Sequence, residues 1–206
     1  MNAERKRRLS KCVLWFFVRF FEVDRLHGAY LWVMMQAGVY CDMQYSSISS
    51  PSFSALQVSS ETRVAIVAAR WNADIIDRLV AGAYEAWSKC GGDASRLELL
   101  RCPGSYELPF AAMECAQTGR YDAVIVLGCV IRGETYHFEI VAEAASNGIM
   151  RVMLETRVPC IFGVLTTNTV DQALARAATG MDNKGYEAVF AALEMIALQK
   201  HIRTVS

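Results

Sequence analysis

The chain has 206 residues, enough for one sizeable domain and rather few for two. Its 21 basic residues balance 21 acidic ones, so the overall charge makes no case for a nucleic-acid or anionic-membrane partner. Hydrophobic residues make up 53% of the chain, which is high for a soluble protein. With a net charge near zero, this composition favours burial of part of the surface against copies of the same chain.

The cysteines are scattered. Seven are present, without a C-x-x-C pair and without a cysteine-histidine cluster of zinc-finger spacing. Thiols in such a pattern are typically small buried apolar residues of a reducing compartment. We therefore predict a cytoplasmic protein with no metal site and no disulfide framework.

Residues 1–60 differ in character from the rest. A basic run precedes VLWFFVRFFEV (13–23), as in a signal peptide, but Arg19 interrupts the apolar stretch and no small-residue cleavage site follows. A transmembrane helix needs about 20 apolar residues, which this stretch lacks. A basic amphipathic helix lying on a membrane is an alternative. We interpret the segment as an N-terminal extension or an over-long start, joined by a flexible polar linker at 45–54 to a domain at 61–206.

The domain begins with a strand and a helix. RVAIVAA (63–69) has the β-branched and small apolar residues of a strand covered on both faces. Asn72 or Asp74 can cap the helix that follows, and Gly91-Gly92 ends it. Apolar residues recur through this helix at helical spacing: Ile75, Ile76, Leu79, Val80, Ala83 and Trp87.

Three further strand-helix pairs follow. The predicted strands are SRLELLR (95–101), DAVIVLGCVI (122–131) and VPCIFGVLT (158–166). Helices are predicted through 107–119, over 137–155, in a short segment ending at Arg176, and over 186–201. Thr169 with Gln172 three residues later forms a capping box for the short helix.

Alternating strands and helices predict an α/β fold with a mainly parallel four-stranded sheet and helices on both faces. In such a fold the active site lies just beyond the carboxyl ends of the strands. The segments that follow the predicted strands contain aromatic, hydroxyl, carboxylate, imidazole and glycine residues: 70–72, 103–107, 132–137 and 166–168. We expect these segments to converge on one edge of the sheet.

The third of these segments resembles a nucleotide phosphate loop only in part. Gly128 and Gly133 have the spacing of G-x-x-x-x-G-K-[ST], and Thr135 occupies the hydroxyl position. Glu134, however, stands where the phosphates need a lysine. We conclude that nucleoside triphosphate hydrolysis is not the function.

A simpler anion site remains. Gly133 lets the backbone approach a ligand, and the amides that open the 137–155 helix favour a single phosphate. Arg176 can add a bidentate guanidinium contact. Each residue also has a plain structural interpretation: Arg176 as a solvated helix residue, His137 as a helix-cap or core histidine, and Trp71 as a lid on the core.

Taken together, the segments resemble the lumazine synthase family, whose members catalyse the penultimate step of riboflavin synthesis. The resemblance covers about 62–202. Five segments carry it: ARWNADI (69–75), CPGSYELP (102–109), GCVIRGETYHFEIV (128–141), VPCIFGVLTTNTVDQALARA (158–177) and DNKGYEA (182–188).

The resemblance implies a flavodoxin-like three-layer α/β/α sandwich and a condensation reaction. In that reaction, 5-amino-6-(D-ribitylamino)uracil and 3,4-dihydroxy-2-butanone 4-phosphate give 6,7-dimethyl-8-ribityllumazine, phosphate and water, without a metal or organic cofactor. It also implies a homopentamer, or an assembly of pentamers, with active sites between adjacent subunits. Association with riboflavin synthase is compatible with this family, whereas nucleic acid and membrane are not expected partners.

The resemblance assigns the heterocyclic substrate to residues of three loops. Trp71 matches the aromatic residue that stacks on the pyrimidine ring. The contacts to the ribityl chain and the heterocycle match the following positions: Ser105, Tyr106, Glu107, Cys129, Val130 and Ile131.

The remaining assignments concern the phosphate and the proton transfers. Glu134 and Thr135 match the phosphate-site loop, where Glu134 is interpreted as contributing its backbone. Arg176 matches the phosphate-binding arginine and His137 the proton-transfer residue. Phe162 matches a substrate contact reached from the neighbouring subunit.

One departure concerns the phosphate. Many family members have a lysine a few residues after the arginine, but this chain has AATGM at 177–181, and Lys184 is the nearest substitute. Two alternatives to an active synthase therefore stay open at this point: an oligomeric scaffold that binds a lumazine or flavin without turnover, and another phosphate-binding α/β module.

Overall fold

The computed structural model describes residues 57–205. Within this range four strands form one parallel sheet in the order β2-β1-β3-β4. The strands are β1 (Val64–Ala69), β2 (Leu97–Cys102), β3 (Ala123–Ile131) and β4 (Cys160–Thr167). The predicted N-terminal extension lies outside the described residues as far as residue 56, and so does the interpretation of its apolar stretch and linker.

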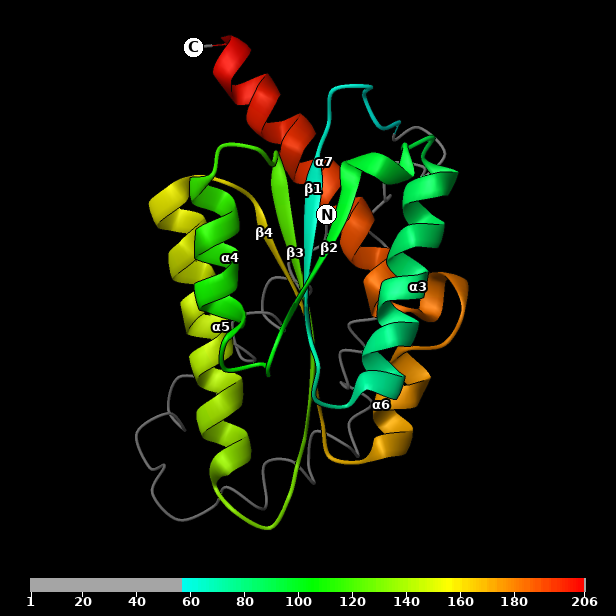
Figure 1. The fold of residues 1–206 in the computed structure, drawn as a ribbon, viewed down its shortest axis with the longest axis vertical. Coiled ribbons are helices and arrows are strands. Elements are labelled where there is room, and N and C mark those ends of the chain that lie inside the picture. Colours follow the sequence, from blue (N-terminus) through cyan, green and yellow to red (C-terminus); the bar gives the residue numbers. More distant parts are fainter. Residues whose placement is uncertain (1–56, 206) are drawn as a thin grey trace, which may run out of the picture. The chain divides into compact units, whose positions relative to one another are not determined.

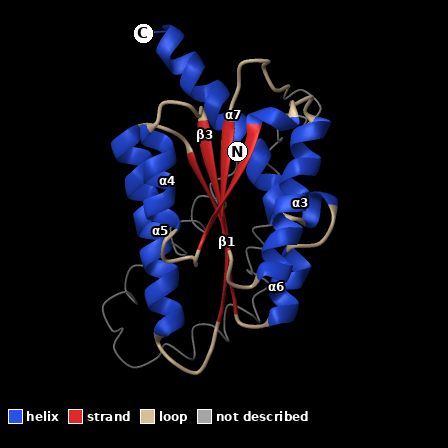
Figure 2. Cartoon of the chain, in the orientation of Figure 1, coloured by secondary structure: helices blue, strands red, loops and turns tan. Residues whose placement is uncertain are grey.

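Helices cover both faces of the sheet (Figures 1 and 2). The α-helices of the described range are α3 (Ala73–Lys89), α4 (Leu108–Gln117), α5 (His137–Thr156), α6 (Val170–Arg176) and α7 (Lys184–Val205). Helices α4 and α5 lie on one face, and α3, α6 and α7 lie on the other. The result is a three-layer α/β/α sandwich, and its strand order is that of flavodoxin-like folds, which confirms the predicted fold class.

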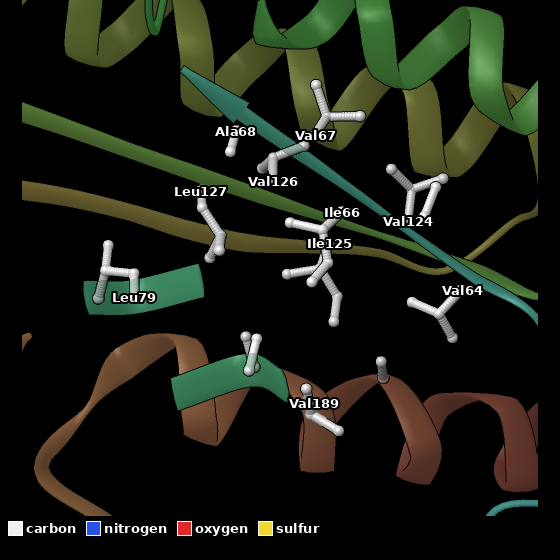
Figure 3. Close-up of a cluster of buried hydrophobic side chains, with 14 of the residues drawn as sticks. Val64, Ile66, Val67, Ala68, Leu79, Val124, Ile125, Val126, Leu127 and Val189 are labelled. Carbon is white, nitrogen blue, oxygen red and sulfur yellow. The ribbon is translucent and has the colours of Figure 1, made fainter. Parts of the chain in front are cut away.

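The core lies between the central strands and the two helical layers. All six residues of β1 are buried, as are the first seven of β3. Ile125 and Leu127 point toward Leu79 of α3 and Val189 of α7, whereas Val124 points to the opposite face of the sheet (Figure 3). Each fully buried side chain of this size stabilises the fold by roughly 1.5–3 kcal/mol. The two strands nearest the middle are therefore the most firmly held part of the sheet.

Among the element boundaries that differ from the prediction, two are explained by polar side chains that satisfy free backbone groups. β2 begins at Leu97 rather than at Ser95, since the Asp93 carboxylate accepts a hydrogen bond from the Ser95 amide (2.9 Å) and closes a 3₁₀ turn. α7 begins at Lys184 rather than at 186. Its first amides are capped by Asn183, whose Oδ1 accepts from the Gly185 amide (2.8 Å) and from the Tyr186 amide (3.1 Å).

Asn183 also holds α7 against α3. Its Nδ2 donates to the carbonyl of Arg78 in α3 (2.9 Å) and to that of Ala178 (2.7 Å). The amide group fills the space beside Gly82, where a Cβ would lie 2.4 Å from it. The loop that follows Arg176 is thus tied to the first helix of the domain.

One further prediction, the buried face of the first helix, can be compared with the described residues. All six apolar positions of the first predicted helix are buried in α3. No helix of the described range is long and apolar enough to cross a membrane.

The closest approach between α3 and α7 generates a test of this packing. A Cβ at Gly185 would lie 2.0 Å from the carbonyl oxygen of Leu79, so Gly185→Ala must push the two helices apart. We expect this variant to lose roughly 1–3 kcal/mol of the free energy of unfolding. Urea denaturation followed by circular dichroism at one fixed protein concentration measures it.

Gly133→Ala is the matched control for stability. Nothing lies within 4 Å of a Cβ at this position, and its φ is outside the left-handed region. We expect its free energy of unfolding to stay within about 1 kcal/mol of the wild-type value. Equal stability of both variants would contradict the helix contact described above.

Candidate active site

The four loops that follow the strands leave the sheet at the same edge, the lower one in Figure 1, because all strands are parallel. Backbone hydrogen bonds hold the first two loops together. The amide of Arg70 donates to the carbonyl of Cys102 (3.0 Å), and that of Trp71 donates to the carbonyl of Pro103 (3.3 Å). A shallow cavity of about 270 Å³ lies here, lined by Arg70, Trp71, Asn72 and Pro103.

Trp71 is exposed rather than packed as a lid on the core. Its side chain stands 75% exposed at the turn between β1 and α3. An indole in this position is free to stack on a planar ring that enters the cavity. The structure therefore disagrees with the core-lid interpretation of this residue.

Asn72 has a role that the sequence did not reveal. Its φ of 62° places it in the left-handed region, which asparagine tolerates better than most residues. It precedes α3, but its side chain makes no capping hydrogen bond. Instead its Nδ2 donates to the carbonyl of Cys129 at the end of β3 (2.9 Å). Asn72 is thus the N-cap residue by position, as one of the two predicted candidates, but its side chain caps no amide of α3 and instead joins the Trp71 turn to the third strand.

The second loop brings a buried hydroxyl and an exposed carboxylate to this edge. Ser105 is buried, and a Cβ at Gly128 in β3 would lie 2.7 Å from its Oγ. A Cβ at Gly104 would lie 3.1 Å from Oε2 of Glu107 and 3.3 Å from Cδ1 of Trp71. Tyr106 and Glu107 are exposed. The predicted heterocycle contacts of the first two loops are thus neighbours in the structure.

The third strand ends in a buried thiol and two partly covered apolar residues. Cys129 is buried, whereas Val130 and Ile131 are half-buried. Burial raises the pKa of the Cys129 thiol to about 11, so this group is uncharged near neutral pH. Cys129 therefore offers the site an apolar surface and a backbone rather than a nucleophile.

The loop from β3 to α5 is open to solvent. Gly133, Glu134, Thr135 and Tyr136 are all exposed, and His137 is the first residue of α5. His137 is exposed, and it directly follows the loop that leaves β3 at the carboxyl edge of the sheet. The structure therefore places it at a helix start, as predicted, and rules out the interpretation as a core histidine.

In the fourth loop Thr169 caps α6 as predicted, but Gln172 does not complete the capping box, because its side chain reaches the amide of Asn168 instead of that of Thr169. The Oγ1 of Thr169 accepts from the amide of Gln172 (3.2 Å), and the Oε1 of Gln172 accepts from the amide of Asn168 (2.8 Å). α6 ends at Arg176, which is exposed and donates from Nη1 to the carbonyl of Gln172 (3.3 Å). Its remaining guanidinium N–H groups can still reach an anion.

Two further residues named in the sequence analysis, Phe162 and Lys184, do not lie where a site at this edge would need them. Phe162 lies within the edge strand β4, opposite Val126 and five residues before the strand ends, with its side chain 40% exposed. Lys184, the substitute for the missing lysine, is paired with the carboxylate of Glu187 (2.7 and 2.8 Å). The structure gives that substitution no support.

A second cavity of about 600 Å³ lies between the far ends of α4 and α5 and is lined by Met113, Ala116, Gln117, Gly119, Glu155, Thr156 and Val158. Its single charged residue, Glu155, is paired with Arg151. None of the predicted site residues lies there. The loops at the carboxyl ends of the strands are the better candidate because aromatic, hydroxyl, imidazole and guanidinium groups gather at that edge.

Comparison with known proteins gives a consistent result. A family model described as 6,7-dimethyl-8-ribityllumazine synthase matches residues 61–200. Proteins of that name from three bacteria are similar to this chain. The Deinococcus radiodurans protein is 50% identical over 145 residues, which cover 70% of this chain and 94% of the relative. The Nautilia profundicola protein is 44% identical over 147 residues, which cover 71% of this chain and 96% of the relative. The Salinibacter ruber protein is 48% identical over 136 residues, which cover 66% of this chain and 87% of the relative.

The buried thiols generate a test of the core and of the strand end. Burial raises the pKa of Cys129 to about 11 and that of Cys160 to about 12. At pH 8 we expect iodoacetamide to alkylate both residues at least about 100-fold more slowly in the folded protein than in the chain unfolded by guanidinium chloride. Peptide mass spectrometry over time measures the rates. Equal rates in the two states would contradict the burial described here.

Proposed function

Because the chain belongs to the 6,7-dimethyl-8-ribityllumazine synthase family, we propose that it condenses 5-amino-6-(D-ribitylamino)uracil with 3,4-dihydroxy-2-butanone 4-phosphate. The products are 6,7-dimethyl-8-ribityllumazine, phosphate and water. The observation that supports the proposal is that the loops with Trp71, Ser105 and His137 follow three neighbouring parallel strands, β1, β2 and β3, and so leave the sheet at one edge. The comparisons give no support to a scaffold without turnover.

The pyrimidine substrate is assigned to the first three loops. The exposed indole of Trp71 stacks on the pyrimidine ring beside the cavity it lines. The ribityl chain carries hydroxyl groups, and Ser105, Tyr106 and Glu107 offer hydroxyl and carboxylate partners for them. The half-buried surface of Val130 and Ile131, next to the neutral Cys129, covers the apolar edge of the heterocycle.

The phosphate is assigned to the loop before α5 and to Arg176. Gly133 has open space where a Cβ would be, so the backbone of Glu134 and Thr135 is accessible to an anion. The first amides of α5 point toward the same loop, and the free N–H groups of Arg176 supply positive charge. These donors stabilise the charge that develops when phosphate leaves.

His137 is assigned the proton transfers. The aryl amine of the uracil attacks the ketone, and loss of water gives an imine. Elimination of phosphate then leaves an enol, which tautomerises to a new carbonyl beside the imine. Attack of the ribitylamino nitrogen on this carbonyl closes the ring with loss of a second water. Each of these steps moves a proton, and an imidazole can accept and donate protons near neutral pH. Holding both substrates together supplies much of the remaining rate enhancement.

Phe162 is assigned to the site of a neighbouring subunit. Its ring is exposed on the edge strand, away from the carboxyl edge of its own sheet. In a cyclic assembly an exposed aromatic residue of one copy can complete the heterocycle pocket of the next. We propose a homopentamer or an assembly of pentamers because the family resemblance implies it, and the exposed Phe162 and the apolar composition of the chain are compatible with such an assembly. The cytoplasmic location inferred from the cysteines and an association with riboflavin synthase belong to the same proposal.

The roles of His137 and Arg176 are tested by steady-state kinetics of lumazine formation. We expect His137→Ala to lower kcat by roughly 10- to 1,000-fold, because a positioned proton carrier is lost. We expect Arg176→Ala to raise the KM for the phosphate substrate and the inhibition constant of inorganic phosphate, while the KM for the uracil substrate changes little.

His201→Ala and Arg203→Ala are the matched controls, since both residues are exposed near the end of α7 and have no assigned role. They should turn over at the wild-type rate. If Arg176→Ala left both phosphate constants unchanged, the phosphate assignment would be wrong.

The shared site is tested by mixing two kinds of impaired subunit. In assemblies of His137→Ala and Phe162→Ala subunits, about a quarter of the sites should carry both native residues if Phe162 serves the neighbour. At substrate concentrations below KM, the mixture should therefore exceed the mean activity of the two pure assemblies.

The control mixture combines His137→Ala with Trp71→Ala. Both residues lie at one edge of the same sheet, so no site regains both and no excess activity is expected. Mean activity in the first mixture as well would show that Phe162 does not complete a neighbour's site.

A further inference from the structure

Arg132, the first residue after β3, makes contacts with three elements of the proposed site. Its Nε donates to Oδ1 of Asn168 (3.0 Å), and its Nη1 donates to the carboxylate of Glu139. The guanidinium carbon lies 4.2 Å from the centre of the Phe138 ring. Its backbone amide donates to the carbonyl of Thr167 at the end of β4 (2.9 Å).

The first consequence concerns the phosphate loop. Residues 133–136 are exposed, and the helix they enter has no side-chain cap at Tyr136. Arg132 anchors one end of this loop through its backbone, and its side chain holds the other end through Phe138 and Glu139. These two residues directly follow His137, so the same contacts restrict where the imidazole can stand. The contacts of Arg132 thus connect the two ends of the loop.

The second consequence concerns the opposite side of the site. The side-chain Oδ1 of Asn168 accepts the hydrogen bond from Nε of Arg132, and the backbone amide of Asn168 donates to the Gln172 side chain (2.8 Å). Gln172 lies in the short helix that ends at Arg176. Arg132 is therefore a direct link between the segment that carries His137 and the segment that carries Arg176.

A direct phosphate ligand is the competing role for this arginine. Its guanidinium already contacts an amide oxygen, a carboxylate and an aromatic face. An incoming phosphate would also meet the negative charge of Glu139, whose pKa is lowered mainly by its hydrogen bond to Arg132. The side chains of Arg132 and Glu139 are 44% and 26% exposed, and exposed ion pairs contribute little to global stability. The geometry suits a local clamp better than a ligand or a stability element.

We propose that Arg132 is a positioning residue that does not contact substrate. It holds the 133–136 loop and the first turn of α5 in a fixed position relative to Asn168, the residue that follows β4. This inference rests on the proposed function for its kinetic consequences. The clamp itself is a property of the free protein, so it can be tested with or without turnover.

The first test is hydrogen exchange of the free protein. In Arg132→Gln and in Glu139→Gln, the backbone amides of 133–140 should exchange faster than in the wild type, and those of β1 should not change. For Arg132→Gln, exchange should also rise in 168–176. The matched control is the pair Arg151→Gln and Glu155→Gln, an i,i+4 ion pair in the same helix, which should leave both segments unchanged. Unchanged exchange of 133–140 in Arg132→Gln would overturn the proposal whether or not the protein turns over its substrates.

The second test separates a clamp from a ligand. If Arg132 positions the site, Arg132→Gln and Glu139→Gln should both lower kcat/KM, by roughly 10- to 100-fold for the first. The double variant should then be little worse than Arg132→Gln alone. Arg132→Lys should not rescue the activity, because an ammonium cannot replace the planar fork that contacts both partners.

Inorganic phosphate is the probe for the competing role. If Arg132 were a direct ligand, Glu139→Gln would free its charge and tighten inhibition by phosphate, while Arg132→Gln would weaken it. Opposite shifts of this kind overturn the clamp, and weaker inhibition in both variants supports it. If the wild-type protein lacked turnover while the variants showed the predicted changes in hydrogen exchange, the proposed function would be refuted and the clamp would still be supported.

Discussion

The candidate site depends first on the parallel pairing of β1 with β3. Both strands are buried on their two faces and hydrogen-bonded along Val64–Ala68 and Ala123–Leu127. Because parallel strands finish at one edge of the sheet, this pairing places the Trp71 turn beside the end of β3. The Asn72 side chain then fixes the distance between them through the Cys129 carbonyl. The positions of the site loops thus depend on the buried apolar pairing of these two strands.

Much of this fold could be predicted because its signals are local and repeated. The strands are near-continuous apolar runs, and α3 shows its buried face as a helical period in the sequence. Thr169 and Gln172 form a cap whose two members are three residues apart, so the sequence displays it directly. Family resemblance added the site assignments, which no periodic pattern contains.

The features that escaped prediction join residues far apart in the sequence. Asparagine favours helix starts, which predicts a local cap at Asn72, yet the hydrogen-bond partner of its side chain lies 57 positions away. Asn183 caps α7 through nearby amides, but its side chain also reaches a carbonyl 105 positions away. The link from Arg132 to Asn168 spans 36 positions and needs both strands in register. Such contacts are decided by tertiary packing, which a single sequence does not display.

The carboxyl edge of the sheet is the proposed place where the two substrates are joined. The most direct test of this proposal is the formation of 6,7-dimethyl-8-ribityllumazine by the purified, fully assembled chain, followed by absorbance and fluorescence with both substrates and with each substrate omitted. The account predicts steady turnover that requires both substrates and releases one phosphate for each lumazine formed. Binding of ribityl ligands without product formation by the assembled protein would contradict it.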